Sequence, residues 1–244
     1  MPATSPAAAR WVRRIRDDIR DGGSPERAAG AQNYFQEAVV CRGWRTADLR
    51  RFSYAKQKEI LVEGGPELLL RVADGLFTGK INEETHAAVM LLENRVRHLG
   101  NTEFALFERW MDRITNWSQH DGLVHYLIGP LIAADPRRAP RIMKWVKSPN
   151  RWKRRAAAVG FIQPGRKGLC FAETKMVTAS LLSDSDDMVQ KGLGWLLREW
   201  AKADPNRTVP FLMTIRTTAP RLVLRTACET LPAAARKRVL ATRH

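Results

Sequence analysis

The chain has 244 residues, of which 44% are hydrophobic, so it can bury a sizeable core and general disorder is excluded. Lysine and arginine outnumber the acids by 41 to 25, and the formal net charge of +16 indicates a polyanionic partner. DNA, RNA and an anionic membrane surface all fit that sign of charge.

Membrane and secretory signals are weak. No apolar run is long enough to span a bilayer, and the arginines from Arg10 onward follow the small apolar residues instead of preceding them, unlike a signal peptide. We therefore expect a cytoplasmic protein.

Helix signals run through the chain from its start. Trp11, Ile15 and Ile19 repeat every fourth residue and predict a leading helix within residues 1–24. Ser24-Pro25-Glu26 is typical of a helix start, and we expect that helix to run over 25–41. Because no segment alternates with period two, no strands are expected. Later helices should begin near Thr46, Pro66, Asn82, Thr102, Ser118, Ala139, Arg151, Phe171, Asp187, Arg207, Pro220 and Ala233.

An internal repeat organises these helices. A basic residue followed by small and apolar residues recurs at intervals of 34 to 36 residues, at His86, His120, Arg155, Lys191 and Arg225. Such a period indicates stacked helix pairs, and the residue pattern fits a HEAT-like repeat better than a tetratricopeptide one. We predict one all-α, HEAT-like helical-repeat solenoid over 1–244, ending in a basic segment, 233–244. The basic positions from His120 on would lie in a row and form a concave DNA-binding face.

Metal and disulfide chemistry is not indicated. Cys41, Cys170 and Cys228 form no CxxC pair, so reduced thiols are expected. His120 and His125 lie five residues apart, a spacing that does not place two ligands on one helical face. The sequence predicts neither a metal nor a cofactor.

Asp121 stands four residues after Trp117, so both side chains could share one face of a helix. Spacing alone favours a second role for Asp121, as part of a capping box with Ser118 at the N-cap. The two roles are compatible, because a first-turn acid is stabilised as a carboxylate by the helix dipole. Five other tryptophans are expected to pack in the interior: Trp11, Trp44, Trp145, Trp152 and Trp200.

Four parts of the chain carry a resemblance to a known family. Gln190–Lys202, with its Gly-Trp-Leu-Leu-Arg-Glu run, and Lys144–Ala157 are similar to the AlkD-type DNA alkylation repair family of bacteria. Asn116–Asp121 resembles the catalytic Trp and Asp segment of that family. Near the start of the chain, Pro25-Glu-Arg-Ala, Asn33-Tyr34 and Arg42-Gly43 resemble its first repeat. The resemblance extends from about Pro25 to Val209.

The resemblance implies a DNA glycosylase that removes cationic N3- or N7-alkylated purines from duplex DNA without a base-flipping pocket or a cofactor. Asp121 would be the catalytic acid, and Trp117 and Trp195 would contact the lesion deoxyribose. Arg155 would contact the DNA backbone, although an intramolecular ion pair or a solvated helix face is about as well supported by its sequence context. Tyr34 would make a further DNA contact, and Arg198 is a weaker candidate.

Two positions depart from that family, in which a second tryptophan and a small apolar residue occupy the places of Asn116 and His120. No lysine is placed as an amine nucleophile, so a monofunctional hydrolase is expected. We also expect a monomer. The alternative is a HEAT-like nucleic-acid-binding protein without catalysis. A protein-binding scaffold is disfavoured by the charge.

Overall fold

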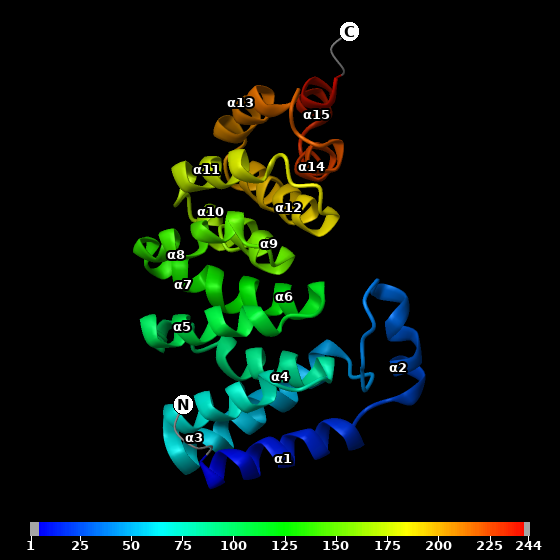
Figure 1. Ribbon diagram of the computed structural model, residues 1–244, viewed down its shortest axis with the longest axis vertical. Helices are drawn as coiled ribbons and strands as arrows, with labels where there is room; N and C mark the ends of the chain where they lie inside the picture. The colour runs from blue at the N-terminus through cyan, green and yellow to red at the C-terminus, as the bar shows by residue number, and fades with distance from the viewer. Residues whose placement is uncertain (1–4, 242–244) are drawn as a thin grey trace. The chain divides into compact units, whose positions relative to one another are not determined.

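The protein is all-α. The computed structural model describes residues 5–241, and within that range it has fifteen α-helices, several short 3₁₀ turns and no strand (Figure 1). The only strand-like pairing within it is an isolated bridge between Val40 and Ile81. These helices form two compact units. The first unit comprises the described residues up to Leu99 together with Glu108–Leu123, and the second comprises Gly100–Phe107 and the described residues from Val124. That the whole chain is one domain stays a prediction.

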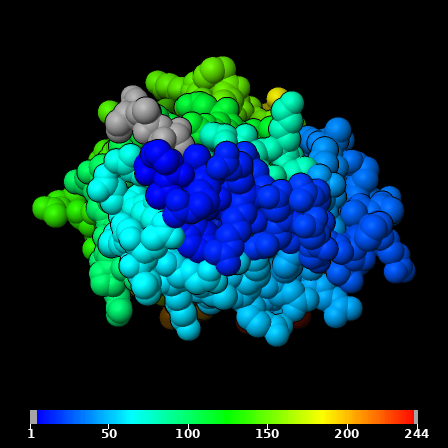
Figure 2. Space-filling model, turned by 90° about the horizontal axis from the view of Figure 1, so that it is seen from below, coloured from blue at the N-terminus to red at the C-terminus, as the bar shows by residue number. Residues whose placement is uncertain are grey.

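The first unit is built on helix α1 and its neighbours. In α1, the buried side chains of Trp11, Ile15 and Ile19 form the stripe that their spacing predicts, and the helix stops before Gly22. Figure 2 shows α1 lying along the outside of α3, with which it packs. Helix α3 in turn packs against α4. The helices of this unit are α1 (Pro6–Asp21), α2 (Pro25–Ala31), α3 (Thr46–Phe77), α4 (Asn82–Glu93), the end of α5 (Asn101–Trp110) and α6 (Trp117–Leu123).

The predicted helix start at Pro66 appears as a break inside α3. Gly64 and Gly65 leave the helical conformation, and Gly65 takes a positive φ of 65°, which glycine adopts at little cost. The chain resumes its helix at Pro66, where a first-turn proline is well tolerated.

The predicted helix over 25–41 is wrong beyond Ala31. Ser24 and Pro25 start α2 as expected, but after it only a 3₁₀ turn, Gln32–Tyr34, follows. Glu83 explains the difference: its Oε1 accepts hydrogen bonds from the backbone N–H groups of Arg42 at 2.9 Å and Gly43 at 2.8 Å. Asn82 N also donates to Val40 O at 2.9 Å. These contacts with α4 hold residues 40–43 in a non-helical path, so tertiary structure overrides local helix propensity.

The second unit repeats one packing arrangement. Helix α12 packs against α9 and α14, and α10 packs against both α7 and α12, as neighbouring ribbons in Figure 1 show. The predicted helix starts from Thr102 onward are confirmed to within two residues. Of the predicted basic segment, 233–241 is described and includes α15, while residues 242–244 lie outside the described range. The helices of this unit are the start of α5, α7 (Gly129–Ala134), α8 (Ala139–Met143), α9 (Arg151–Val159), α10 (Ile162–Arg166), α11 (Phe171–Leu181), α12 (Asp187–Ala203), α13 (Pro205–Ile215), α14 (Arg221–Ala227) and α15 (Ala233–Leu240).

Candidate functional site

Helix α6 carries the candidate catalytic segment. It starts at Trp117, and the Asn116 side chain caps it: Asn116 Oδ1 accepts from Ser118 N and Gln119 N, both at 3.0 Å. The predicted capping box with Ser118 at the N-cap is therefore wrong. Ser118 Oγ instead lies 2.8 Å from Nε2 of His86 on α4. Asn116 Nδ2 donates to Asn82 Oδ1 at 3.2 Å, which ties the start of α6 to the start of α4.

Asp121 is partly exposed on α6. Its side chain retains 22% of its accessible surface, whereas the side chain of the preceding His120 is fully buried. His120 Nδ1 lies 2.7 Å from Asp121 Oδ1. Asp121 thus presents a carboxylate at the surface of the first unit while a buried ring contacts one of its oxygens.

Trp117 lies one helical turn before Asp121 and is held by the segment after α2. Its Nε1 donates to Tyr34 O at 3.2 Å, and its ring stacks on Phe35 with centroids 5.2 Å apart and planes at 22°. Trp117 remains partly exposed, and Tyr34 keeps 77% of its accessible surface. Tyr34 and Trp117 are therefore neighbours in the structure and belong to the same candidate site. Phe35 could not be identified from the sequence, because no local pattern indicates its stacking on Trp117.

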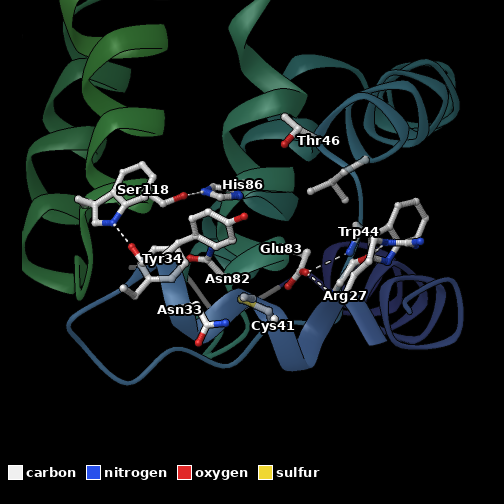
Figure 3. Close-up of a pocket in the computed structure, with 16 residues that line it drawn as sticks. Arg27, Asn33, Tyr34, Cys41, Trp44, Thr46, Asn82, Glu83, His86 and Ser118 are labelled. Atoms are coloured by element: carbon white, nitrogen blue, oxygen red, sulfur yellow. Dashed lines mark hydrogen bonds between the residues drawn. The ribbon is translucent and has the colours of Figure 1, made fainter. Parts of the chain in front are cut away.

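A hollow of about 640 Å³ opens beside these residues (Figure 3). Its wall comes from α2 and the turn after it, from the Cys41–Thr46 stretch, and from the first turns of α4 and α6. Tyr34, Glu83, His86 and Ser118 all line it. Burial lowers the pKa of His86 from its ordinary value of 6.5 and outweighs the opposing influence of Ser118 and Glu83, so the ring is held neutral near pH 7.

In the second unit, Trp195 lies on α12 and is also partly exposed. Its indole stacks on His125, with centroids 5.2 Å apart and planes at 26°. His125 belongs to a π-helical turn, Val124–Ile128, and its Nε2 accepts a hydrogen bond from Gln163 Nε2 at 3.2 Å. The glycine before Trp195 has a packing role, because a Cβ on Gly194 would lie 2.6 Å from Thr226 Cβ on α14. The Gly-Trp pair therefore combines a close helix contact with a partly exposed indole.

Arg155 and Arg198 are held within the second unit. Arg155 on α9 is only 5% exposed, and its Nη1 donates to Met188 O at 2.6 Å. Gly192 leaves the space for this side chain, since a Cβ there would lie 2.9 Å from Arg155 Cγ. Arg198 forms an ion pair with Glu229.

The predicted basic row is only partly at the surface. The four positions fall on α6, α9, α12 and α14, one helix in each repeat, as the period predicts. Lys191 and Arg225 are exposed, but His120 and Arg155 are buried. Two of the four predicted positions are therefore not exposed basic groups, and a basic concave face stays a prediction.

Of the five tryptophans predicted to pack in the interior, Trp11, Trp152 and Trp200 are buried, whereas Trp44 and Trp145 stay partly exposed. Cys41, Cys170 and Cys228 are free thiols. In residues 5–241, no group of three His, Cys, Asp or Glu side chains could hold a metal ion. In that same range, no helix combines the length and apolar character needed to cross a membrane.

Comparisons with known proteins agree with the helical fold described above. A sequence model of the family described as DNA alkylation repair enzyme matches residues 15–231. Comparison with curated protein sequences gives no match. Among solved structures, a predicted DNA alkylation repair enzyme from Enterococcus faecalis is similar, with a TM-score of 0.77 and 19% identity over 86% of this chain and 97% of that one.

Two proteins of Streptococcus mutans are similar as well. AlkD2 gives a TM-score of 0.62 and 17% identity over 93% of this chain and 100% of that one. The protein smu.31 gives 0.55 and 20%, over 77% of this chain and 98% of that one. These likenesses show a shared helical-repeat fold. Because that family model covers most of the sequence, the chain belongs to the DNA alkylation repair enzyme family.

Proposed function

We propose that the protein is a monofunctional DNA glycosylase that hydrolyses the N-glycosidic bond of cationic N3- or N7-alkylated purines in duplex DNA. The observation that carries the proposal is the pair Trp117 and Asp121, one turn apart on α6 and both partly exposed. Membership of a DNA alkylation repair family and a formal net charge of +16 support DNA as the substrate.

The chemistry requires little proton transfer to the base. Alkylation at N3 or N7 gives the purine a positive charge, so the electron pair of the breaking bond neutralises the base as it leaves. The sugar becomes oxocarbenium-like, water adds to C1′, and the proton of that water is lost to solvent. A carboxylate placed beside the sugar stabilises the developing positive charge and orients the water, as in glycoside hydrolysis.

Asp121 is suited to that role in two respects. Its carboxylate is partly exposed at the protein surface, where DNA can approach it. One of its oxygens is also held by a buried side chain. Trp117 would add an indole face that attracts the positive sugar by a cation–π contact.

The remaining predicted contacts are assigned by the family resemblance. Tyr34, which is largely exposed, would contact DNA next to Trp117. In the second unit, Trp195 would contact the lesion deoxyribose. Because Arg155 is only 5% exposed, its contact with the DNA backbone requires a local rearrangement.

A base-release assay tests the proposal. With excess enzyme and duplex DNA carrying one N7-methylguanine, the wild-type protein should release the base and leave an abasic site without strand cleavage. Asp121→Asn keeps the size of the side chain but removes its charge, and the rate should fall by about 10²-fold or more. Asp17→Asn removes the same charge from the exposed side of α1 and should retain the wild-type rate.

The alternative function gives a different result. A HEAT-like nucleic-acid-binding protein without catalysis would bind the duplex with a steep salt dependence and release no base. Base release at the wild-type rate by Asp121→Asn would instead refute the catalytic role of Asp121.

A further inference from the structure

His120 and Asp121 are neighbours in sequence that occupy different environments. Successive residues of an α-helix are turned by roughly 100° from one another, so they do not share a face. The His120 side chain is accordingly fully buried, while the Asp121 carboxylate is partly exposed. Nδ1 is the ring nitrogen closer to the backbone, and it reaches Asp121 Oδ1 at 2.7 Å. The contact therefore runs from the interior of the protein to a candidate catalytic group at its surface.

The chemistry of the two groups fixes the direction of this hydrogen bond. An ionised carboxylate only accepts hydrogen bonds, whereas an imidazole nitrogen donates only when it carries a proton. His120 Nδ1 must therefore carry the hydrogen and donate to Oδ1. A hydrogen bond to an ionised acceptor is short and strong, which agrees with the 2.7 Å separation.

We propose that His120 is a positioning residue that fixes the orientation of the Asp121 carboxylate for attack on the lesion sugar. This inference rests on the proposed catalytic role of Asp121. A carboxylate can turn about both bonds that link it to the backbone, and a bond from an immobile ring to one oxygen restricts both rotations. Because the reaction depends on where the negative charge lies relative to C1′, a loss of that restriction should lower the rate of the chemical step.

Two polar substitutions separate donation at Nδ1 from other properties of the ring. His120→Asn places an amide N–H near the position of Nδ1, whereas His120→Gln carries its amide one bond farther out, nearer the position of Nε2. In single-turnover base release, we expect His120→Asn to stay within about threefold of wild type and His120→Gln to fall by about tenfold or more. DNA affinity should not change in either variant. His98→Leu, which removes an exposed histidine of the same unit, is the matched control.

A double-mutant cycle with Asp121→Asn shows whether His120 acts through the aspartate. If it does, His120→Gln should add no further loss in the Asp121→Asn background. Equal rates for His120→Asn and His120→Gln, or additive losses in the cycle, would overturn the positioning role. Thermal melting of each variant identifies any that fails to fold. If His120→Gln does not fold, His120→Asn still tests the proposal, because a tenfold loss of rate in a stable His120→Asn protein would also overturn it.

The outcomes distinguish this inference from the function on which it rests. If Asp121→Asn is slow but His120→Gln releases base at the wild-type rate, only the positioning role is wrong. If the wild-type protein releases no base, both are wrong.

Discussion

Glu199 follows the Trp195 segment on α12 and should make the stability of the second unit depend on pH. Its carboxylate accepts hydrogen bonds from Arg166 on α10 at 2.7 and 3.1 Å, and from Lys202 at 2.8 Å. Burial alone would raise the pKa of Glu199, but the bonds from Lys202 and Arg166 outweigh it and lower the pKa from 4.5 to about 2. Glu199 thus holds α12, which carries Trp195, against α10.

The size and sign of the effect follow from that shift. A change of roughly 2.5 pKa units corresponds to about 3 kcal/mol at 1.36 kcal/mol per unit. Because the side chains of Arg166 and Lys202 are 43% and 46% exposed, solvent screens part of the attraction, and we expect about 2 kcal/mol. A pKa that is lower in the folded state means that protonation favours unfolding. The contribution is therefore fully present above about pH 4.5 and is lost as pH falls toward 2.

Urea unfolding of the wild type and of Glu199→Gln, at several pH values from 7 to 3, measures this contribution directly. Comparison of the two proteins is necessary because other carboxylates, such as Asp187, also have a lowered pKa. The variant should be less stable by about 2 kcal/mol at pH 7, and the difference should shrink toward pH 3. If the two stability curves stay parallel over the whole range, the attribution to Glu199 is wrong.

Two further predictions concern the support of α6. Asn116→Ala removes the cap and the bond to Asn82, and should lower the free energy of unfolding by about 1 to 2 kcal/mol in urea titrations. Ser118→Ala should lower it by less, and the reverse order would contradict the assignment of the cap. Phe35→Ala removes the ring stacked on Trp117. It should lower the rate of base release more than it lowers DNA affinity, because the indole is then less well placed. An unchanged rate would show that the stack has no catalytic consequence.

The helices could be predicted from sequence because their boundaries depend on local chemistry. Pro6, Ser24-Pro25 and Asp186 begin helices by fixing φ or by accepting first-turn N–H groups. The repeat period likewise reflects the regular size of a helix pair. The stretch that follows Ala31 could not be predicted in this way, because its path depends on Glu83, which lies about 40 residues farther along the chain.

Part of the candidate site could also be predicted from the sequence. The four-residue spacing places Trp117 and Asp121 on one helical face, and the structure retains both near the surface. The choice of cap could not be made from the sequence, since Asn116 and Ser118 are both good capping residues. In the structure, the Ser118 hydroxyl contacts His86, which is distant in sequence, instead of capping the helix. Burial of Arg155 was also hidden, because it depends on the space left at Gly192 in the next repeat.

The anchoring of the Arg42–Trp44 segment has a consequence for divergence within the family. Glu83 Oε1 binds this segment through three main-chain N–H groups, of Arg42, Gly43 and Trp44. Main-chain groups are the same in every residue except proline, so the anchor places no requirement on the side chains of residues 42 and 44. Gly43, with a φ of 79°, is the constrained position. Substitutions other than proline at residue 42 can therefore accumulate over evolution while the course of the backbone is preserved, whereas Trp44 is constrained separately because its Nε1 donates to Ile19 O at 2.8 Å.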